Sequence, residues 1–390
     1  MKKKVLTALG VFLALILVFL IVRWPRVPIL AWQPPTTPKP VGILAPNEKL
    51  TKTVMLGGSE MLEPEDSAFD KQGRLYGSCD DGKIRRILKN GKTEVFADTK
   101  GRPLGIEFAP NGDLIVADVY KGLVSINPKG KVTVLADSYK GKKMIFVDDV
   151  DVDKEGVMYF TDASTLTDWI KGVKLDMLSR TPTGRVFSYH PKTKKLTLLL
   201  DKLYFANGIT LSHDEDYLLV NETANYSVRR YWLKGPKKGK SETIIKNLPG
   251  FPDNVDRSST KGEYWVSLAT PRVPAGDKLH PNAFLKKLVL TLPDFLLPQA
   301  IKAGKVLRIS VDGKILETLQ DTKGKVIYNI TSTNEVDGYL YFGHIYHHST
   351  GIGKYKLPKR PVPPAKPAKR PKASPKATPT PKTKQPTERR

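Results

Sequence analysis

A short pattern occurs six times in the middle of this 390-residue chain: a turn containing Gly or Asp, followed by alternating apolar residues. Such alternation is typical of half-buried β-strands. The six copies are centred on Leu75, Leu114, Val157, Tyr217, Tyr264 and Leu340, at intervals of 39, 43, 60, 47 and 76 residues. Three intervals match the roughly 40–50 residues of a four-stranded propeller blade, and the other two indicate insertions. The repeat therefore predicts an all-β fold, a six-bladed β-propeller, over residues 47–357.

The same pattern predicts how the ring closes and where it is interrupted. Extended runs at Lys49–Leu56 and Lys354–Leu357 are expected to share one blade, which would leave no sheet edge unpaired. The two insertions are expected at Ser164–Arg180 and Pro271–Gly304. The second contains a helical pattern and predicts a short helical insertion between blades 5 and 6.

Apolar residues in that second insertion recur at helical spacing, with Lys286 and Lys287 off the apolar stripe and Pro281 suited to the first turn. The stripe consists of Phe284, Leu285, Leu288, Val289 and Leu292. One interpretation is a lid helix packed on the propeller. The other is an interfacial helix over residues 281–297 that lies on a membrane.

Residues 1–24 are expected to form a short cytoplasmic stub and a transmembrane anchor. Val5–Val22 is an 18-residue run without a charge, long enough to span a bilayer as a helix. Three lysines precede it, which predicts a single-pass protein with a cytoplasmic N-terminus and a periplasmic or otherwise extracytoplasmic body. The alternative is a cleaved signal peptide, although no clear small-residue cleavage site follows the run.

Both ends of the propeller region adjoin Pro-rich segments. Residues 25–46 are expected to be an extended, semi-rigid linker that holds the body off the membrane. Residues 358–390 mix Pro, Lys, Ala and Thr and are expected to be disordered. This tail is either simply solvated or in contact with anionic lipid or cell-wall polymer.

The net charge is +25, from 64 Lys and Arg against 39 Asp and Glu, but it is concentrated at the ends. Residues 1–26 carry +5 and residues 359–390 carry +10, which leaves +10 for everything between them. With no nucleic-acid-binding motif either, we expect no nucleic-acid partner. Cys79 is the single cysteine, so neither an intrachain disulfide nor a Cys-based zinc site is possible.

A second repeated position lies about ten residues before each turn strand. Aligning the six units places at this position Glu65, Leu104, Asp148, Asn207, Asp253 and Thr331. The innermost strands of a propeller surround its channel, so three carboxylates and one amide are expected to meet there. Carboxylates at one point repel unless a cation lies between them or one is protonated. Ca²⁺ fits this oxygen-rich set best and Mg²⁺ is the alternative, unless these residues merely form turns at strand ends.

Several blocks carry a resemblance to a known family. They are GRPLGIEF, TPTGRVFSYHP, LYFANGITLS, NETANYSVRRYWLKGP and LPGFPDNVDRSSTKGEYWVSLATPR. Together they resemble strictosidine synthase-like proteins of the adipocyte plasma membrane-associated type, within the gluconolactonase–paraoxonase superfamily of six-bladed propellers. The resemblance covers roughly residues 45–357. It implies a calcium site at the positions of Glu65, Asp148, Asn207 and Asp253, with Asn254 as a further ligand.

Two positions depart from the family pattern. Asp148 stands where calcium-dependent relatives usually have Asn, which makes the site more negative and should tighten cation binding. Thr331 stands where the amine-condensing strictosidine synthase has Glu, which disfavours that condensation here.

The leading functional hypothesis is a metal-dependent hydrolase of esters or lactones. Asp253 is the candidate general base or nucleophile, and Asp149 is the next candidate base. His347 is a third candidate if its loop reaches the channel mouth, and a surface histidine otherwise. No Gly-x-Ser-x-Gly elbow is present, so a serine esterase is not expected. The alternative is a non-catalytic propeller that binds a partner or a cell-envelope ligand.

Overall fold

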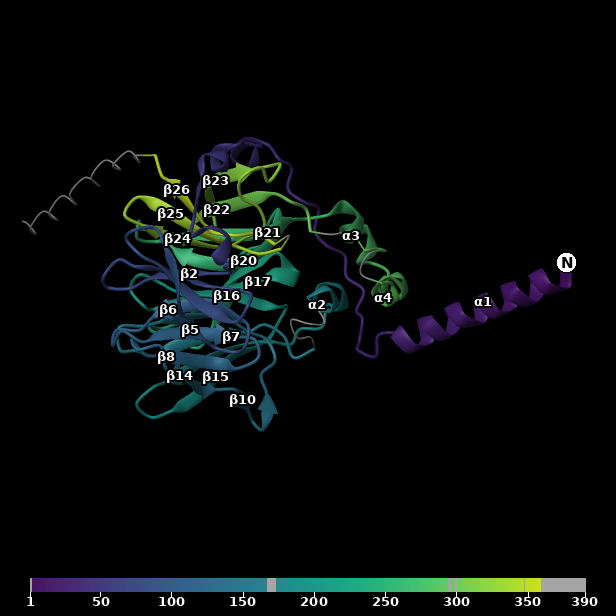
Figure 1. The fold of residues 1–390 in the computed structure, drawn as a ribbon, viewed down its shortest axis with the longest axis horizontal. Helices are drawn as coiled ribbons and strands as arrows, with labels where there is room; N and C mark the ends of the chain where they lie inside the picture. The colour runs from purple at the N-terminus through teal and green to yellow at the C-terminus, as the bar shows by residue number, and fades with distance from the viewer. Residues whose placement is uncertain (1, 167–172, 294–295, 298–299, 347, 359–390) are drawn as a thin grey trace, which may run out of the picture. The chain divides into compact units, whose positions relative to one another are not determined.

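The computed structural model describes residues 2–166, 173–293, 296–297, 300–346 and 348–358. Six four-stranded antiparallel sheets are arranged as the blades of a propeller, which confirms the predicted fold (Figure 1). Blade 1 contains β2 (Ser67–Phe69), β3 (Leu75–Ser78), β4 (Lys83–Ile87) and β5 (Thr93–Asp98). Blade 2 contains β6 (Pro103–Phe108), β7 (Leu114–Asp118), β8 (Gly122–Ile126) and β9 (Val132–Ala136). A small hairpin follows, formed by β10 (Ser138–Tyr139) and β11 (Lys142–Lys143).

The next three blades repeat this order. Blade 3 contains β12 (Val147–Val152), β13 (Met158–Asp162), β14 (Gly184–His190) and β15 (Lys195–Leu203). Blade 4 contains β16 (Ala206–Leu211), β17 (Tyr217–Glu222), β18 (Ser227–Trp232) and β19 (Ser241–Ile245). Blade 5 contains β20 (Gly250–Arg257), β21 (Glu263–Pro271), β22 (Gly304–Ser310) and β23 (Ile315–Asp321).

Blade 6 is built from both ends of the propeller sequence. Its strands are β24 (Ile330–Val336), β25 (Tyr339–His344), β26 (Ile352–Lys356) and β1 (Val54–Leu56). β1 pairs antiparallel with β26, and Val54 is opposite Lys354. The predicted closure is therefore confirmed, with one correction: Lys49–Lys52 is a short 3₁₀ helix and only the last three residues of the expected run are a strand.

Both expected insertions are present, and both connect the second strand of a blade to its third. The first lies in blade 3 and contains α2 (Lys174–Ser179); the second contains α3 (Pro274–Leu279) and α4 (Ala283–Thr291). The second insertion was predicted to lie between blades 5 and 6, and this position was wrong because β21 and β22 belong to the same sheet. The spacing of the repeat shows that residues have been added between two turn strands, but not at which connection.

The predicted apolar stripe of α4 is exposed at its N-terminal end. Phe284 is 63% exposed and Leu285 is 43% exposed, whereas the Lys286 side chain is fully buried. The other three residues of the stripe, Leu288, Val289 and Leu292, are half-buried. Asn282 caps the helix by accepting a hydrogen bond from the Leu285 N–H at 3.0 Å. The helix therefore exists as predicted, and its first turn is not packed against the body as a lid.

The Pro-rich linker is extended as predicted, and it packs on the propeller's insertions. Its backbone lies along them: the Leu30 N–H donates to the Ser179 carbonyl at 2.8 Å, and the Trp32 N–H donates to the His280 carbonyl at 3.0 Å. Proline content did not predict these contacts, because it does not show which distant residues meet the linker. Its role as a spacer from the membrane stays a prediction.

Helix α1 (Lys2–Arg23) precedes this linker. It is long and apolar enough to cross a bilayer, and in the described part of the chain it is the one helix that is. This agrees with the predicted anchor, while its orientation across a membrane stays a prediction. The predicted disordered tail, apart from Pro358, lies outside the described residues.

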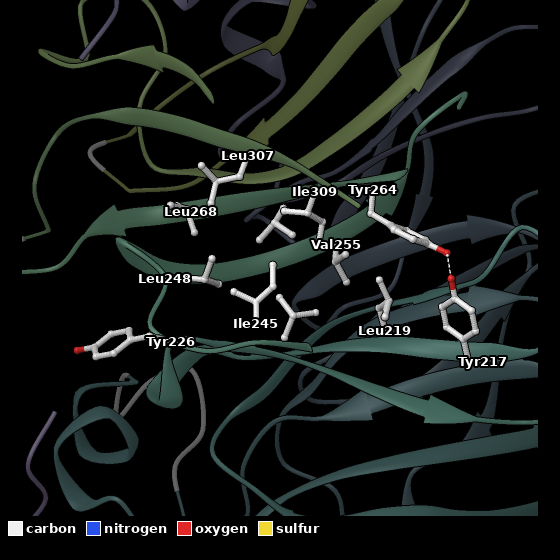
Figure 2. Close-up of a cluster of buried hydrophobic side chains, with 12 residues drawn as sticks. Tyr217, Leu219, Tyr226, Ile245, Leu248, Val255, Tyr264, Leu268, Leu307 and Ile309 are labelled. Atoms are coloured by element: carbon white, nitrogen blue, oxygen red, sulfur yellow. Dashed lines mark hydrogen bonds between the residues drawn. The ribbon is translucent and has the colours of Figure 1, made fainter. Parts of the chain in front are cut away.

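The core lies between neighbouring blades. Between blades 4 and 5, fully buried Leu219 and Leu268 belong to one cluster with Leu307 and Ile309 of β22 (Figure 2). The hydroxyls of Tyr217 and Tyr264 lie 2.7 Å apart across this interface, so that both polar ends have a partner inside an apolar layer. Such packing keeps the blades, and therefore the innermost strands, in fixed positions around the channel.

Candidate metal and active site

The candidate site residues lie where the innermost strands begin, and five of the six innermost strands carry a register shift at that point. The shifts fall between Pro103 and Ile106, Val147 and Val150, Ala206 and Ile209, Pro252 and Val255, and Ile330 and Thr333. A β-bulge adds a residue to one strand and turns its side chains out of the regular alternation. Five of the six aligned positions noted in the sequence lie within these shifts, and the sixth, Glu65, lies just before β2. The fold therefore repeats one side-chain position around the channel.

The bulge also explains the glycines that follow in two blades. A Cβ on Gly208 would lie 2.3 Å from Cα of Asn254, and one on Gly105 would lie 2.2 Å from Oδ1 of Asp149. Neighbouring blades approach too closely at these points for any side chain. Glycine there allows the next blade to bring its own polar residue to the channel.

All five predicted metal ligands are buried in this region. Glu65, Asp148, Asn207, Asp253 and Asn254 are exposed by only 2 to 7%. Four of them have an oxygen with no hydrogen-bond partner among the described residues. These atoms are Glu65 Oε2, Asp148 Oδ2, Asn207 Oδ1 and Asn254 Oδ1. Buried acceptors are almost always satisfied in folded proteins, so these four oxygens, three at aligned positions and one directly after Asp253, are free to take a cation or the hydrogen of a water molecule.

Direct contacts and charge effects show that these side chains are neighbours. The Asn254 amide donates to Glu65 Oε1 at 3.3 Å, across the channel between blades 5 and 1. Burial raises the pKa of Glu65 well above its ordinary value, and the carboxylates of Asp253, Asp66 and Asp148 raise it further. Burial, and then Asp253, likewise raises the pKa of Asp148. Burial raises the pKa of Asp253 to about 7. Each carboxylate therefore disfavours ionisation of the others.

The donor set fits a hard cation such as Ca²⁺, which takes six to eight oxygen ligands from carboxylates, amides and carbonyls. A cation would satisfy the unpaired oxygens and remove the repulsion between the carboxylates. Among the residues that the structure describes, no group of three or more His, Cys, Asp or Glu side chains already stands at ligand spacing. The five predicted ligands therefore fit a cation through the kind of oxygens they offer, which come from both carboxylates and amides.

Asp149 has a different environment from Asp148. Its Oδ2 accepts a hydrogen bond from the Ile209 N–H of blade 4 at 2.7 Å, and its Oδ1 accepts one from the Val150 N–H at 2.8 Å. Asp66 makes the same link from blade 1 to blade 2, accepting from the Ile106 N–H at 3.0 Å. These carboxylates join consecutive blades, and the role of Asp149 as a base stays a prediction.

His347 lies outside the described residues, but the residues before it bring an unpredicted side chain to the site. Tyr346 follows β25 and has φ of 73°, which is rare for an aromatic residue. Burial raises the pKa of its phenol, and the nearby carboxylates of Asp253, Glu63 and Asp148 raise it further. The charges of two candidate ligands, Asp253 and Asp148, therefore act on this phenol. No local signal marks Tyr346, because the path of a connecting loop decides its position.

Arg102 is the second residue that sequence reasoning missed. It is 2% exposed, its Nε lies 3.0 Å from Asp80 Oδ1, and its charge opposes the rise in the pKa of Asp148. It belongs to the GRPLGIEF block, so that block was noted while its arginine was not. A buried guanidinium paired with Asp80 therefore adds positive charge close enough to Asp148 to act on it.

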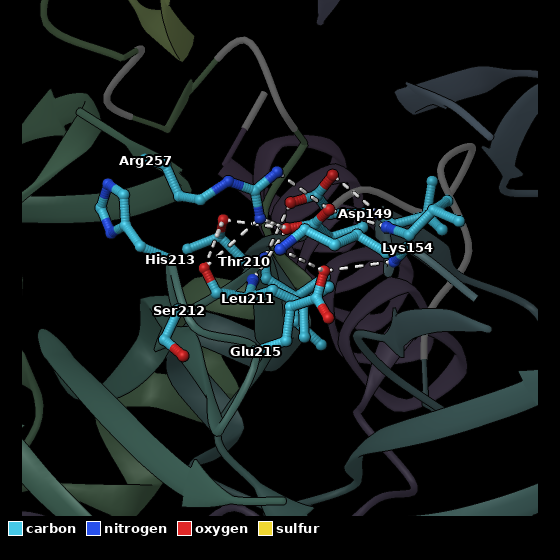
Figure 3. Close-up of polar contacts among 12 residues, drawn as sticks. Asp149, Lys154, Thr210, Leu211, Ser212, His213, Glu215 and Arg257 are labelled. Carbon is cyan, nitrogen blue, oxygen red and sulfur yellow. Dashed lines mark hydrogen bonds and ion pairs between the residues drawn. The ribbon is translucent and has the colours of Figure 1, made fainter. Parts of the chain in front are cut away.

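Two cavities of about 690 and 380 Å³ lie toward the opposite end of the channel. Here Arg257 forms an ion pair with Asp151 at 2.5 Å, and Glu215 accepts from the Lys154 N–H at 3.2 Å (Figure 3). The larger cavity is lined mainly by the turns between first and second strands. The smaller one is lined by the innermost strands and includes Asp149, the second candidate base. None of the five predicted ligands lines them, so cavity size alone would point away from the candidate site.

Several known proteins are similar to this chain in sequence. Family models for the N-terminal part of strictosidine synthase-like proteins and for strictosidine synthase match residues 42–87 and 148–236. The adipocyte plasma membrane-associated protein of Rattus norvegicus is 37% identical over 327 residues, which cover 77% of this chain and 86% of the relative. The chain belongs to the strictosidine synthase-like family. Another member, strictosidine synthase-like 4 of Arabidopsis thaliana, is 34% identical and covers 80% of this chain and 84% of its own length.

Solved structures of other proteins have a fold similar to that of this chain. A gluconolactonase from Xanthomonas campestris has a TM-score of 0.55 at 16% identity, covering 76% of this chain and 87% of its own. Regucalcin from Agrobacterium tumefaciens, described as a calcium-binding protein, has a TM-score of 0.54 at 14% identity, covering 76% and 90%. At these identities the likeness establishes the propeller fold alone.

Proposed function

We propose that this protein is a metal-dependent hydrolase of esters or lactones with a Ca²⁺-type ion in the propeller channel. The observation that carries the proposal is the set of four unsatisfied buried oxygens at the starts of innermost strands. Glu65, Asp148, Asn207, Asp253 and Asn254 would hold the ion. When bound, such an ion supplies Lewis-acid stabilisation of the negative charge that develops on a carbonyl oxygen. The gluconolactonase neighbour supports a hydrolytic reaction class.

The chain's own side chains would handle the proton and orient the substrate. Asp253 is the general base in this proposal because its carboxylate lies at the site in a strand fixed between two blades. Tyr346 and Arg102 would orient a polar substrate group, since a phenol and a guanidinium both donate hydrogen bonds. Thr331 is fully buried and its hydroxyl donates to the Glu65 carbonyl, so the position expected to carry an acid for condensation holds a structural hydroxyl.

The test uses the purified full-length chain in lipid nanodiscs. We expect bound calcium by elemental analysis, turnover of aryl esters or lactones that EDTA abolishes, and recovery on adding Ca²⁺. Asp253→Ala should lose turnover. Asp214→Ala is the matched control because that side chain is 60% exposed in a surface ion pair. Unchanged turnover in Asp253→Ala, or turnover insensitive to EDTA, would contradict the proposal.

A non-catalytic binding propeller is the second candidate. It is favoured by the names of the family relatives, which state a location or a likeness and no reaction. In that case the metal would only stiffen the channel, and the same experiment would show bound calcium without turnover.

We also propose that the body lies outside the cytoplasm, on the periplasmic side of the membrane. The three lysines before the apolar part of α1 support this orientation. The test fuses after Pro40 a reporter that functions only in the cytoplasm. Activity of that reporter would contradict the proposal. For the basic tail, contact with anionic lipid or cell-wall polymer likewise stays a prediction.

A further inference from the structure

The first turn of helix α4 exposes apolar residues and buries a lysine, the reverse of an ordinary surface helix. Such a helix buries its apolar residues and exposes its lysines. Here Lys286 is fully buried and its Nζ donates to the Leu30 carbonyl, while Phe284 and Leu285 point away from the body. Leu296, beyond the helix, is 57% exposed as well. Exposed aromatic and aliphatic side chains close together mark a surface that contacts something apolar.

The segment that receives Lys286 is the juxtamembrane linker, and residues 28–37 of it form what we call the strap. The strap is held at several points: Thr181 donates to the Pro28 carbonyl at 2.9 Å, Arg272 to the Pro35 carbonyl at 2.7 Å, and Asn247 to the Thr36 carbonyl at 2.8 Å. These contacts join it to both insertions and to the connection after β19. The strap is thus fixed to the body by side-chain donors spread along its length.

One strap side chain is held especially firmly. The Arg180 guanidinium lies 3.7 Å from the centre of the Trp32 ring and 4.1 Å from that of Tyr204. The His280 ring packs edge-on against Trp32 at 5.0 Å. An arginine between two aromatic faces is a strong local attachment. Residue 32 therefore cannot move far from the body while these contacts persist.

The distance from the strap to the end of α1 is short. Only residues 24–27 separate Arg23, the last residue of α1, from Pro28. Even fully extended, the five steps from Arg23 to Pro28 span about 17 Å at roughly 3.4 Å per residue. Trp24 within it packs against Phe284 with ring centres 5.7 Å apart, and Lys287 lies over the Trp24 ring at 6.0 Å. Tryptophan is enriched at membrane–water interfaces, and lysine there meets anionic headgroups.

The insertions leave the propeller at the same edge as the candidate site. In blade 3, Val147 at the start of β12 is opposite Asp162 at the end of β13, where the first insertion begins. In blade 5, Gly250 at the start of β20 is opposite Pro271 at the end of β21, where the second begins. α2 and α4 also contact each other (Figure 1). The strap, α4 and the unsatisfied oxygens therefore share one face of the propeller.

We propose that the strap and α4 hold this face of the propeller against the bilayer in which α1 is anchored, with Phe284 and Leu285 in the lipid interface. A bilayer is the occupant favoured by the structure because the exposed residues are continuous with the end of α1 through Trp24. A retained α1 brings α4 within the short reach of residues 24–27. The candidate site then opens toward the membrane, and its ligands would be amphiphilic molecules that partition into lipid. This inference goes beyond the proposed hydrolysis and does not depend on it.

The test places an environment-sensitive fluorophore on a single introduced cysteine in the full-length chain. The native Cys79 is fully buried, so labelling reports the new position. Phe284→Cys is the test position. Val134→Cys in β9, which is 49% exposed on the outermost strand of blade 2, is the matched control. Both proteins are reconstituted in vesicles of phosphatidylcholine with one-fifth phosphatidylglycerol.

At position 284 we expect blue-shifted emission that a lipid-borne nitroxide quenches and aqueous iodide does not. At position 134 we expect the opposite. Equal quenching by iodide at both positions would overturn the proposal. So would protection of position 284 from both quenchers, which would show that a second copy or another protein covers the helix. Because no step measures turnover, failure here and failure of the hydrolase proposal are separate results.

An unlabelled double variant tests the same surface, in case the label itself disturbs the helix. Phe284→Ser combined with Leu285→Ser should leave the melting temperature nearly unchanged, because both side chains are exposed. The same double variant should weaken binding of α1-deleted protein to these vesicles. Deletion is made before Trp24, which keeps the strap. Vesicle binding that is unaffected by the double substitution would also overturn the proposal.

Discussion

At the residue scale, the site is defined by oxygens that have no partner rather than by any single reactive group. Asp148 and Asp149 are adjacent in the chain, yet one has an unsatisfied oxygen and the other accepts two backbone hydrogen bonds. The bulge separates them by turning consecutive side chains in different directions. Chemical type alone does not distinguish the two, whereas hydrogen-bond partners do.

Asp148 allows a graded test of metal binding. Asp148→Asn keeps an oxygen ligand but removes one negative charge, so we expect calcium to remain bound with roughly tenfold lower affinity. Titration of the purified full-length chain by isothermal calorimetry measures this change. Asp149→Asn is the comparison: it should weaken the link between blades 3 and 4 and lower the melting temperature. A larger loss of affinity in Asp149→Asn than in Asp148→Asn would reverse the assignment.

Glu107 provides a pH test away from the proposed ligands. Burial first, and then the Asp151 carboxylate, raises the pKa of Glu107 to about 8, although Arg257 opposes the rise. An unfolded glutamate releases its proton near pH 4.3, so between about pH 4.3 and 8 the folded state holds a proton that the unfolded state has lost. The free energy of unfolding therefore falls as the pH rises through this window.

Glu107→Gln cannot titrate, so we expect its melting temperature to fall less steeply between pH 5 and 8 than that of the unmodified chain. Glu60→Gln, at an exposed position, should leave the slope unchanged. Scanning calorimetry across this range measures both. Parallel curves for the Glu107→Gln variant and the unmodified chain would show that Glu107 does not carry this dependence.

At the element scale, the strap and the insertions form one unit that the propeller supports. Trp32 is half-buried, and Trp32→Ala should destabilise this unit by about 3 kcal/mol, at the lower end for aromatic truncations. Hydrogen exchange in α2, α3 and α4 should accelerate, while exchange in β17 and β21 stays slow. Leu30→Ala, in the same strap but with an exposed side chain, should change little. Uniform acceleration across the propeller would contradict a separate unit.

Elements differ in how far their sequence determines them. Six blades were predictable because the alternation around Leu75 and its five equivalents is local. For α4, the spacing of Phe284 and Leu285 correctly placed both on one face of a helix, but spacing does not say which face is packed. That depended on Leu30, more than 250 residues away, accepting from Lys286. The strap, Tyr346 and Arg102 were missed for the same reason, since each depends on contacts between distant segments.

At the scale of the whole molecule, closure of the ring is the contact on which the other blades depend. β26 pairs with both β25 and β1, and Ile352 within it is fully buried. Ending the chain after Gly351 should therefore abolish cooperative thermal unfolding, because two strand edges and part of the core become exposed. Ending it after Pro358 should leave the melting temperature unchanged. Circular dichroism measures the melting temperature of each truncated chain. Equal melting temperatures would show that β26 is dispensable.

The position of β1 has a further consequence, for the order of events during synthesis. Val54 pairs with Lys354, so the first strand to leave the ribosome must wait 300 residues for its partner. Blade 6 is therefore the last to form, and pairing of such distant segments makes folding slow. Until then the nascent chain is an open arc with two unpaired sheet edges. Such edges can pair with other chains, so the arc is the state of this protein most exposed to aggregation, and completion of the ring removes both edges at once.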